Sequence, residues 1–203
     1  MTVSLDAVAD VRRSTTTIGQ SSSIEKPQHD IKVESASIED ANAMADVGAR
    51  SFGNMTGQSV PDADLEVFMA ANYSAPAMMT ELKDPGKLTL VARTKDNNAI
   101  VGIIQLVRGQ TDACLGGEAA ESCCLQKLYV DPFVHGKGVG TRLIGALEER
   151  ARAEGFKQIW LTVWEENPKA HRLYERLGYR KAGETGFWFG TLRQNDWVYL
   201  KAL

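Results

Sequence analysis

A glycine-rich turn between a strand and a helix limits the possible structure and ligands of this chain more than any other sequence feature. Gly136, Gly138 and Gly140 alternate there, after a strand-like segment at residues 123–130 and before an amphipathic helix at residues 140–154. At such a junction the first backbone N–H groups of the helix have no internal acceptor, and the helix dipole makes that end positive. Glycine also lets the backbone approach a ligand closely. The turn therefore predicts an anion site suited to a pyrophosphate.

Two other glycine-rich phosphate loops do not fit this spacing. A Walker loop needs a Lys-Ser/Thr pair directly after its last glycine, where this chain has Thr141 and Arg142. The dinucleotide fingerprint GxGxxG, started at Gly136 or Gly138, would need its last glycine at Thr141 or Leu143. The glycines alone are also compatible with an ordinary strand-to-helix loop.

The remaining hydrophobic pattern predicts one mixed α/β domain over residues 31–203. The expected strands are residues 31–36, 88–93, 99–108, 123–130, 159–164, 179–181, 187–190 and 197–203. The expected helices are residues 38–52, a helix that begins at residues 61–62, and residues 76–82, 140–154 and 168–177. Residues 1–30 are polar and aperiodic, which predicts a flexible N-terminal tail.

The first helix has a clear start and an irregular apolar face. Ser37 and Asp40 resemble a capping box, with Asp where Glu is usual. Gly48 stands where the periodicity calls for a larger apolar residue, and Val47 lies one position off the apolar stripe.

Composition excludes several classes of protein. The net charge of −3 and the pI near 5.7 give no general electrostatic reason to bind nucleic acid. The three cysteines form no CxxC pair and lie at no metal-ligand spacing, so neither a disulfide nor a metal site is expected. No apolar run approaches the roughly 20 residues that cross a bilayer. We therefore expect an intracellular, cytoplasmic protein without membrane or nucleic-acid partners.

The turn and the segments after it are similar to a known family. Val130-x-Pro132, followed by residues 135–144, resembles the acetyl-CoA motif Q/R-x-x-G-x-G/A of the GNAT N-acetyltransferases, with His135 where Gln or Arg is usual. Residues 159–203 follow one another at the spacing of the small bacterial spermidine/spermine N-acetyltransferases. The resemblance implies the GNAT fold, a mostly antiparallel α/β sheet with a splayed parallel strand pair, flanked by helices.

The resemblance also implies acetyl-CoA as co-substrate and suggests which residues contact it. These are Leu128, Tyr129, Val130, His135, Gly136, Lys137, Gly138, Val139, Gly140, Thr141, Asn167 and Tyr174. His135 is either a phosphate donor, a cap for the loop or a plain surface histidine. Asn167 is also the expected N-cap of the helix that Pro168 opens. Tyr129 is equally compatible with simple packing.

Acetyl transfer to an amine needs a proton donor for the leaving thiolate and a way to deprotonate the amine. In the family, a tyrosine at the position of Tyr174 commonly donates to the coenzyme A sulfur, although the periodicity alone makes Tyr174 a core aromatic. Relatives often carry a basic Glu on the strand before the turn, where this chain has Gln126. Glu165 is the substitute candidate for the base, and its alternative is a solvated acid at a strand end.

The acceptor site is expected to be aromatic. Trp164, Phe187 and Trp188 can surround an ammonium group through cation–π contacts, with core packing as the alternative for each ring. The resulting hypothesis is an N-acetyltransferase that moves acetyl from acetyl-CoA to a polyamine or similar small primary amine by direct attack. Acetylation of an antibiotic, an amino acid or a protein N-terminus is an alternative. A non-catalytic acyl-CoA-binding module is another, and a homodimer is left open.

Overall fold

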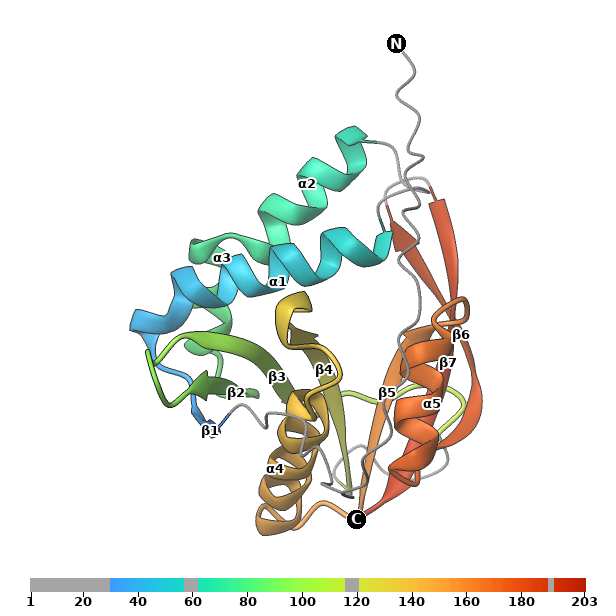
Figure 1. Ribbon diagram of the computed structural model, residues 1–203. Helices are drawn as coiled ribbons and strands as arrows, with labels where there is room; N and C mark the ends of the chain where they lie inside the picture. Colours follow the sequence, from blue (N-terminus) through green and yellow to red (C-terminus); the bar gives the residue numbers. More distant parts are fainter. Residues whose placement is uncertain (1–29, 57–61, 116–120, 190–191) are drawn as a thin grey trace, which may run out of the picture.

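The computed structural model describes residues 30–56, 62–115, 121–189 and 192–203 (Figure 1). The predicted tail at residues 1–30 therefore lies almost wholly outside the described residues. The strands are β1 (Ile31–Ser35), β2 (Lys87–Thr94), β3 (Ile100–Arg108), β4 (Ser122–Val130), β5 (Gln158–Trp164), β6 (Arg180–Phe189) and β7 (Leu192–Ala202). The α-helices are α1 (Ala41–Thr56), α2 (Asp62–Tyr73), α3 (Ala75–Leu82), α4 (Val139–Ala153) and α5 (Pro168–Arg176).

The strands of the described chain form one sheet in the order β1-β2-β3-β4-β5-β7-β6. All its neighbours are antiparallel except β4 and β5. That parallel pair is short, because only residues 122–124 of β4 pair with residues 158–160 of β5. Both strands then continue without pairing to each other, so the sheet opens between them (Figure 1). The predicted fold class, with its splayed parallel pair, is confirmed.

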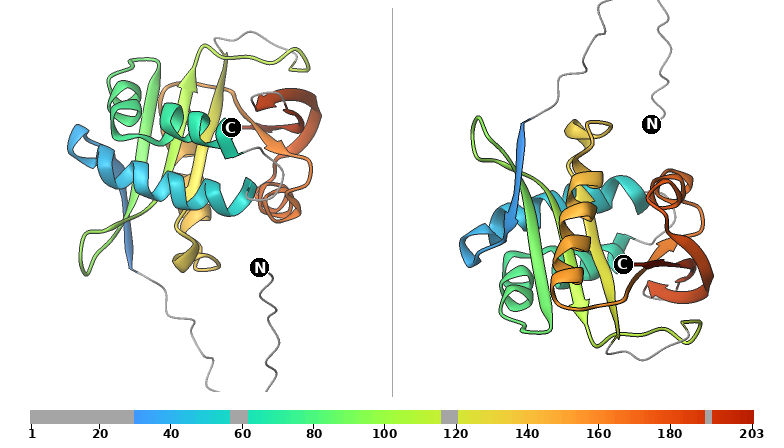
Figure 2. Two further views of the ribbon diagram at one scale, coloured as in Figure 1. Left: turned by 90° about the horizontal axis from the view of Figure 1, so that it is seen from above. Right: turned by 90° about the horizontal axis from the view of Figure 1, so that it is seen from below.

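Helices cover both faces of the sheet. The buried face of α1 packs with α2 and α3 against β2, β3 and Tyr129 of β4. On the other face, α4 and α5 share one apolar cluster with β3, β4, β5 and β7. Figure 2 shows α1 and α2 over one side of the sheet and α4 over the opposite side. We call these the α1 face and the α4 face.

The irregular stripe of α1 has a steric cause. A Cβ at Gly48 would lie 2.6 Å from Cδ1 of Tyr73, so the glycine makes room for the tyrosine ring that α2 places there. Val47 is fully buried despite its offset position. The predicted capping box is confirmed, since the backbone N–H of Ser37 donates to Asp40 Oδ2 at 2.8 Å.

One strand prediction was wrong. Residues 179–181 and 187–190 were expected as separate strands, whereas β6 is one strand that pairs with β7 from Arg180 to Phe189. The two glycines of the intervening segment obscured it. A Cβ at Gly183 would lie 2.7 Å from the Cys114 sulfur, so a neighbouring loop packs closely on β6 at that point.

A buried ion pair fastens α4 to β7. The Nζ of Lys201 lies 2.8 and 2.7 Å from the two carboxylate oxygens of Glu148, and the hydroxyl of Tyr179 donates to Glu148 Oε1 at 3.0 Å. The side chain of Glu148 is only 8% exposed. The carboxylate is therefore compensated by a cation and a hydroxyl donor where water has little access.

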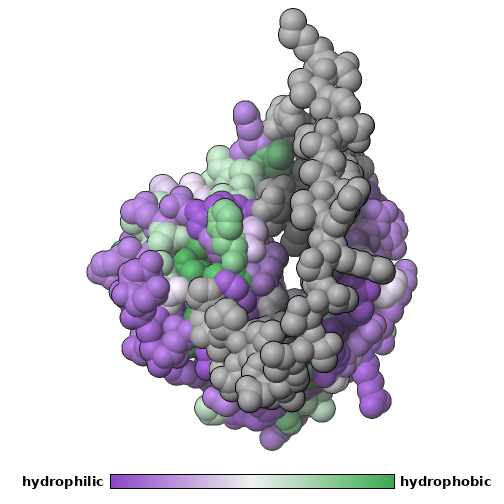
Figure 3. Space-filling model, viewed as in Figure 1, coloured by the Kyte–Doolittle hydropathy of each residue, from purple (hydrophilic) through white to green (hydrophobic). Residues whose placement is uncertain are grey.

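Figure 3 shows one face of the molecule, where the described residues are mainly hydrophilic and apolar residues are visible only in limited areas among them. In the part of the chain that the structure describes, no helix is long and apolar enough to span a membrane.

Candidate active site

The opening between β4 and β5 is the central feature of the site. It is bounded by residues 125–130 of β4 and residues 161–164 of β5, which lie beyond the last parallel pair. In the described sheet, the β4 backbone along this edge has no strand partner, so its N–H and C=O groups can bind an extended ligand. We call this gap the strand opening.

A β-bulge sets which β4 side chains face which layer. Lys127 has a φ of 53°, and the pairing of β3 with β4 shifts by one residue between Gln126 and Tyr129. Beyond the bulge, Leu128 packs into the α4-face cluster and Tyr129 into the α1-face cluster. The bulge thus presents Tyr129 to the same side as α1, next to the strand opening.

The glycine turn has the geometry of an anion site. Gly136 and Gly138 have φ values of 75° and 79°, and nothing lies within 4 Å of a Cβ built on either residue. Gly138 is the N-cap of α4, and the N–H of Arg142 makes the first intrahelical bond, to Gly138 O at 3.1 Å. The N–H groups of residues 139–141 precede that bond and have no acceptor within the helix. Open space and free donors therefore coincide, which fits a pyrophosphate.

Contacts of Asp131 and His135 hold the turn in place. Asp131 accepts a hydrogen bond from the backbone N–H of Phe133 at 3.1 Å and forms an ion pair with Arg50 of α1 at 2.8 Å. The Nε2 of His135 lies 2.8 Å from the carbonyl oxygen of Val130. His135 thus ties the turn to the end of β4, which is the loop-capping role among those considered for it.

Tyr174 has a buried ring and an unbonded hydroxyl. The ring packs against Tyr179 and Tyr199, with centroids 5.6 and 6.2 Å apart. No residue in the described part of the chain is hydrogen-bonded to the hydroxyl. Burial raises the pKa of Tyr174, and the nearby Tyr129 raises it further. Since Tyr129 belongs to β4 and α5 follows β5, the Tyr174 hydroxyl lies near the strand opening and is protonated at neutral pH.

Among the other predicted site residues, Asn167 has its expected place, whereas the predicted base and aromatic residues are not brought together. Asn167 Oδ1 accepts from the N–H of Ala170 at 3.1 Å, so Asn167 is the N-cap of α5. The side chain of Glu165 is exposed. Trp164 is half-buried and Trp188 is 64% exposed, and no ring contact joins them within the described residues. The side chain of Phe187 lies outside the described residues.

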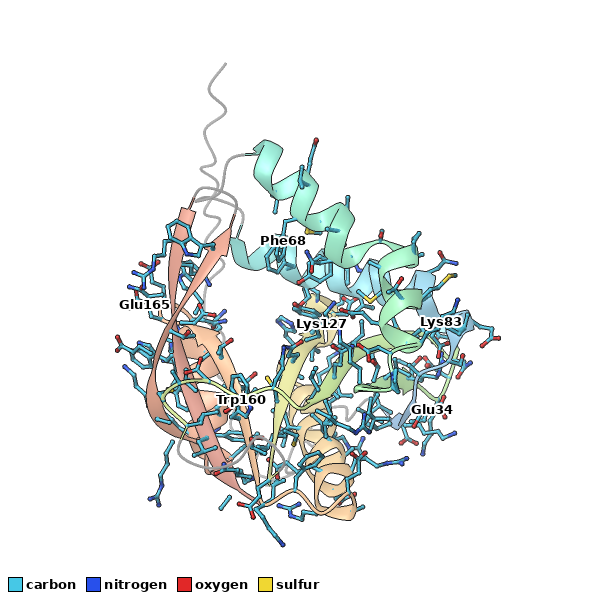
Figure 4. The ribbon with its side chains drawn as sticks, turned by 180° about the vertical axis from the view of Figure 1, so that it is seen from behind. Glu34, Phe68, Lys83, Lys127, Trp160 and Glu165 are labelled. Carbon is cyan, nitrogen blue, oxygen red and sulfur yellow. The ribbon has the colours of Figure 1, made fainter. Side chains whose placement is uncertain are left out.

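The structure adds a polar cluster beside the strand opening. The hydroxyls of Tyr73 and Tyr129 are hydrogen-bonded to each other. Lys127 Nζ lies 2.8 Å from Glu81 Oε2 and 5.7 Å from the centroid of the Tyr73 ring. Figure 4 shows Lys127 and Phe68 on one side of the gap between the two halves of the molecule, with Trp160 on the other. The residues of this polar cluster come from α2, α3 and β4, and no local sequence signal groups them.

Comparison with known proteins agrees with this geometry. The profile of the acetyltransferase (GNAT) family matches residues 56–179. An uncharacterized N-acetyltransferase of Mycobacterium tuberculosis is 30% identical over 164 residues, which cover 81% of this chain and 98% of that protein. A probable spermine N(1)-acetyltransferase of Bacillus subtilis subsp. natto is 36% identical over 64 residues, 31% of this chain and 42% of that protein.

A solved structure shows the same fold with the cofactor product bound. The PaiA N-acetyltransferase from Thermoplasma acidophilum, in complex with coenzyme A, superimposes with a TM-score of 0.69 at 20% identity, covering 86% of this chain and 99% of that one. The chain belongs to the GNAT family of acetyltransferases. It is an acetyl-CoA-dependent acyltransferase, and acetyl-CoA is its co-substrate.

Two glycines of α4 provide a matched test of the turn. Gly140 and Gly145 both lie in the helix without positive φ, and a Cβ at either meets no atom closer than 3.7 Å. Gly140→Val and Gly145→Val should therefore have similar small effects on helix stability. Only Gly140→Val places a side chain beside the free N–H groups, so we expect it alone to weaken acetyl-CoA binding, by at least tenfold, about 1.4 kcal/mol.

Isothermal titration calorimetry of the two folded variants with acetyl-CoA measures this difference. Equal affinities would show that the pyrophosphate does not bind at the turn. Gly138 is a poorer choice, because its positive φ would strain any side chain and confuse the two effects.

Proposed function

We propose that this enzyme transfers the acetyl group to a primary amine of a polyamine or similar small cationic acceptor. The observation that carries the proposal is the unbonded, protonated hydroxyl of Tyr174 at the strand opening, beyond the anion-binding turn. A donor in that place is what the leaving thiolate of coenzyme A requires.

Each part of the site has a role in this proposal. The free N–H groups of residues 139–141 bind the pyrophosphate, for which Gly136 and Gly138 leave room, and the unpaired edge of β4 at residues 128–130 binds the pantetheine arm. Asn167 fixes the start of α5 and so the position of Tyr174. Within the described chain, no group of His, Cys, Asp or Glu side chains could hold a metal, and none is needed here.

Direct attack of the amine is favoured over an acetyl-cysteine intermediate. Cys124 is the cysteine at the base of the strand opening, in the pair with Trp160. Burial raises the pKa of its thiol to about 12, so the nucleophilic thiolate is scarce at neutral pH. All three cysteines are unpaired, which supports the proposal that the enzyme acts in the reducing cytoplasm.

Charge supports a cationic acceptor. Asp196 of β7 pairs with Thr185 of β6, and the Thr185 hydroxyl is hydrogen-bonded to Asp112. Asp112 and Asp196 thus both neighbour Thr185, whereas Lys127 on the opposite side is already neutralised by Glu81. The partial match to a probable spermine acetyltransferase points in the same direction.

An amine panel tests the proposal. Spermidine and spermine are compared with an aminoglycoside, free amino acids and a peptide with a free N-terminus, and release of the coenzyme A thiol is measured. We expect release only with an amine present and the highest kcat/KM with the polyamines. Preference for an uncharged or anionic acceptor would refute the polyamine assignment, and thiol release that no amine accelerates would refute amine transfer.

A further inference from the structure

Asp196 lies near the C-terminal end of β5, on the α1 face of the sheet. Its partner on β5 is Trp164, and Val198 is paired with Thr162. Val198 packs with Trp160 and Cys124 in a cluster separate from that of α4 and α5. Residues two apart on a strand share a face, so Asp196 and Val198 point to the same side of β7.

The opposite side of β7 confirms this orientation. Trp197 and Tyr199 alternate with Asp196 and Val198, and both pack into the α4-face cluster. The hydroxyl of Thr162 is hydrogen-bonded to Asp196, which requires both side chains to be on one face. Asp196 is therefore on the same side of the sheet as Tyr129, and it lies next to the end of β5 that borders the strand opening.

Among the residues that the structure describes, no cation forms an ion pair with the carboxylate of Asp196. The residue is 9% exposed, and Oδ1 accepts from Nε2 of Gln194 at 2.8 Å. Its two described hydrogen-bond partners, Gln194 and Thr162, are neutral. Burial raises the pKa of this carboxyl, and the negative charge of Glu165 adds to that effect. A buried carboxylate that has neutral hydrogen-bond partners and no ion-paired cation binds a proton more tightly than a carboxylate in an ion pair.

We propose that Asp196 is the catalytic base that removes the proton from the ammonium group of the acceptor. This rests on the amine-acetyltransferase function proposed above. Asp196 replaces Glu165 as the candidate base, because the side chain of Glu165 is exposed and lies just beyond the end of β5. Asp196 instead points from the paired part of β7 to the α1 face, beside the end of β5 at Trp164.

The proton and electron balance is simple. Asp196 takes one proton from R–NH₃⁺, and the freed nitrogen lone pair forms a bond to the thioester carbonyl carbon. As the C–S bond breaks, Tyr174 protonates the leaving sulfur, and the nitrogen gives up a second proton that restores Tyr174. The products are the amide and the free thiol, and Asp196 passes its proton to water. No oxidant, metal or further reactant is required.

The assignment predicts a specific pH dependence. The active form of Asp196 is the carboxylate, so kcat/KM should fall as pH drops through its pKa, which lies above the ordinary value of about 3.9. The groups that face it are Thr162 and Glu165 from the β5 side, Gln194 from β7, and Thr185 with its bonded Asp112 from the β6 side. Asp112 and Glu165 are the titratable ones, and both carry the same charge sign as Asp196.

The test compares Asp196→Asn with wild type on two acceptors. One is the best primary amine of the panel, which is protonated at neutral pH. The other is hydroxylamine, which is neutral at that pH and needs no base before it attacks. We expect Asp196→Asn to lower kcat with the primary amine by roughly 10²–10⁴-fold, the usual contribution of a positioned base. With hydroxylamine we expect a loss of less than about threefold, and the acid limb of the pH profile should vanish.

Two further variants make the comparison sharp. Glu184→Gln removes an exposed carboxylate from neighbouring β6 and should behave as wild type. Asp196→Glu keeps the carboxylate and should recover part of the rate with the primary amine. The thermal midpoint of Asp196→Asn should equal or exceed that of wild type, because ionising a buried carboxyl with a raised pKa opposes folding.

Several outcomes would overturn the proposal. Full activity of folded Asp196→Asn with the primary amine would do so, and so would equal losses with both acceptors, which indicate a structural role. A large loss confined to Glu165→Gln would restore the earlier candidate. A wild type that acetylates hydroxylamine but no primary amine would instead refute the proposed acceptor class, and with it the need for a base.

Discussion

Replacing Tyr174 by Phe should lower kcat and kcat/KM together, by roughly 10²–10⁴-fold, while the affinity for acetyl-CoA stays unchanged. The reason is that the hydroxyl has no hydrogen-bond partner in the described structure, so its loss removes a proton donor and no native contact. The ring keeps its packing against Tyr179 and Tyr199. Steady-state kinetics with the best amine and a calorimetric titration with acetyl-CoA measure the two effects.

Tyr179→Phe is the matched control for this experiment. Tyr179 is also a buried tyrosine in the same cluster, but its hydroxyl donates to Glu148 at 3.0 Å. Removing that bond to a charged group should cost about 1.5–3 kcal/mol of stability and leave the rate alone. If Tyr174→Phe keeps its rate within about threefold, well under 1.4 kcal/mol of barrier, Tyr174 is a core residue and not the acid.

The raised pKa of Tyr174 also fixes the alkaline side of the pH profile. Because burial disfavours the phenolate, the hydroxyl stays protonated beyond the ordinary tyrosine pKa of about 10. Loss of activity through ionisation of Tyr174 is therefore expected only above that value. Stability from this group is complete below pH about 10 and is lost as pH rises through the folded pKa.

Glu148→Ala should have the largest effect on stability. The change leaves Lys201 and the Tyr179 hydroxyl without their shared acceptor, and breaking a buried ion pair from one side costs about 3 kcal/mol or more. For a domain of this size the melting temperature should fall by roughly 6–12 °C. Glu149→Ala, at the exposed neighbouring position of α4, is the control and should change it little.

Denaturant titrations of both variants give the free energies of unfolding directly. A loss below about 1 kcal/mol in Glu148→Ala would place this pair among ordinary surface ion pairs. Glu148 is near the middle of α4 and the glycine turn is at its start. Acetyl-CoA affinity measured on the folded fraction should therefore remain close to that of wild type.

The local parts of the fold were predictable because their signals are local. The capping box of Ser37 and Asp40, the N-cap Asn167 and the glycine turn all involve residues within a few positions of one another. The course of β6 was not predictable in the same way, because its pairing with β7 overrides the two glycines in it.

The candidate site was predictable only in part, for a related reason. The turn follows from the spacing of its glycines and Tyr174 from the family resemblance, whereas Asp196 stands out only when the register of β5 and β7 puts it near Thr162 and on the α1 face. Similarly, the positive φ of Lys127 and its ion pair with Glu81 depend on a β-bulge that the residue types at these positions do not predict. The position of Glu165 directly after Trp164 made it a candidate base, but a position along the chain does not predict whether a side chain is exposed.

The position of β7 between β5 and β6 has a consequence for how the protein is made. When β6 has left the ribosome, it has no strand to join, because its only partner in the described sheet is β7, which is synthesised after it. The half of the sheet from β1 to β4, with α1 to α4, can pack earlier during synthesis. The clusters around Tyr174 and Asp196 can close only once residues 192–202 insert. A nascent chain stalled before that point should therefore carry a formed anion-binding turn and no working catalytic centre.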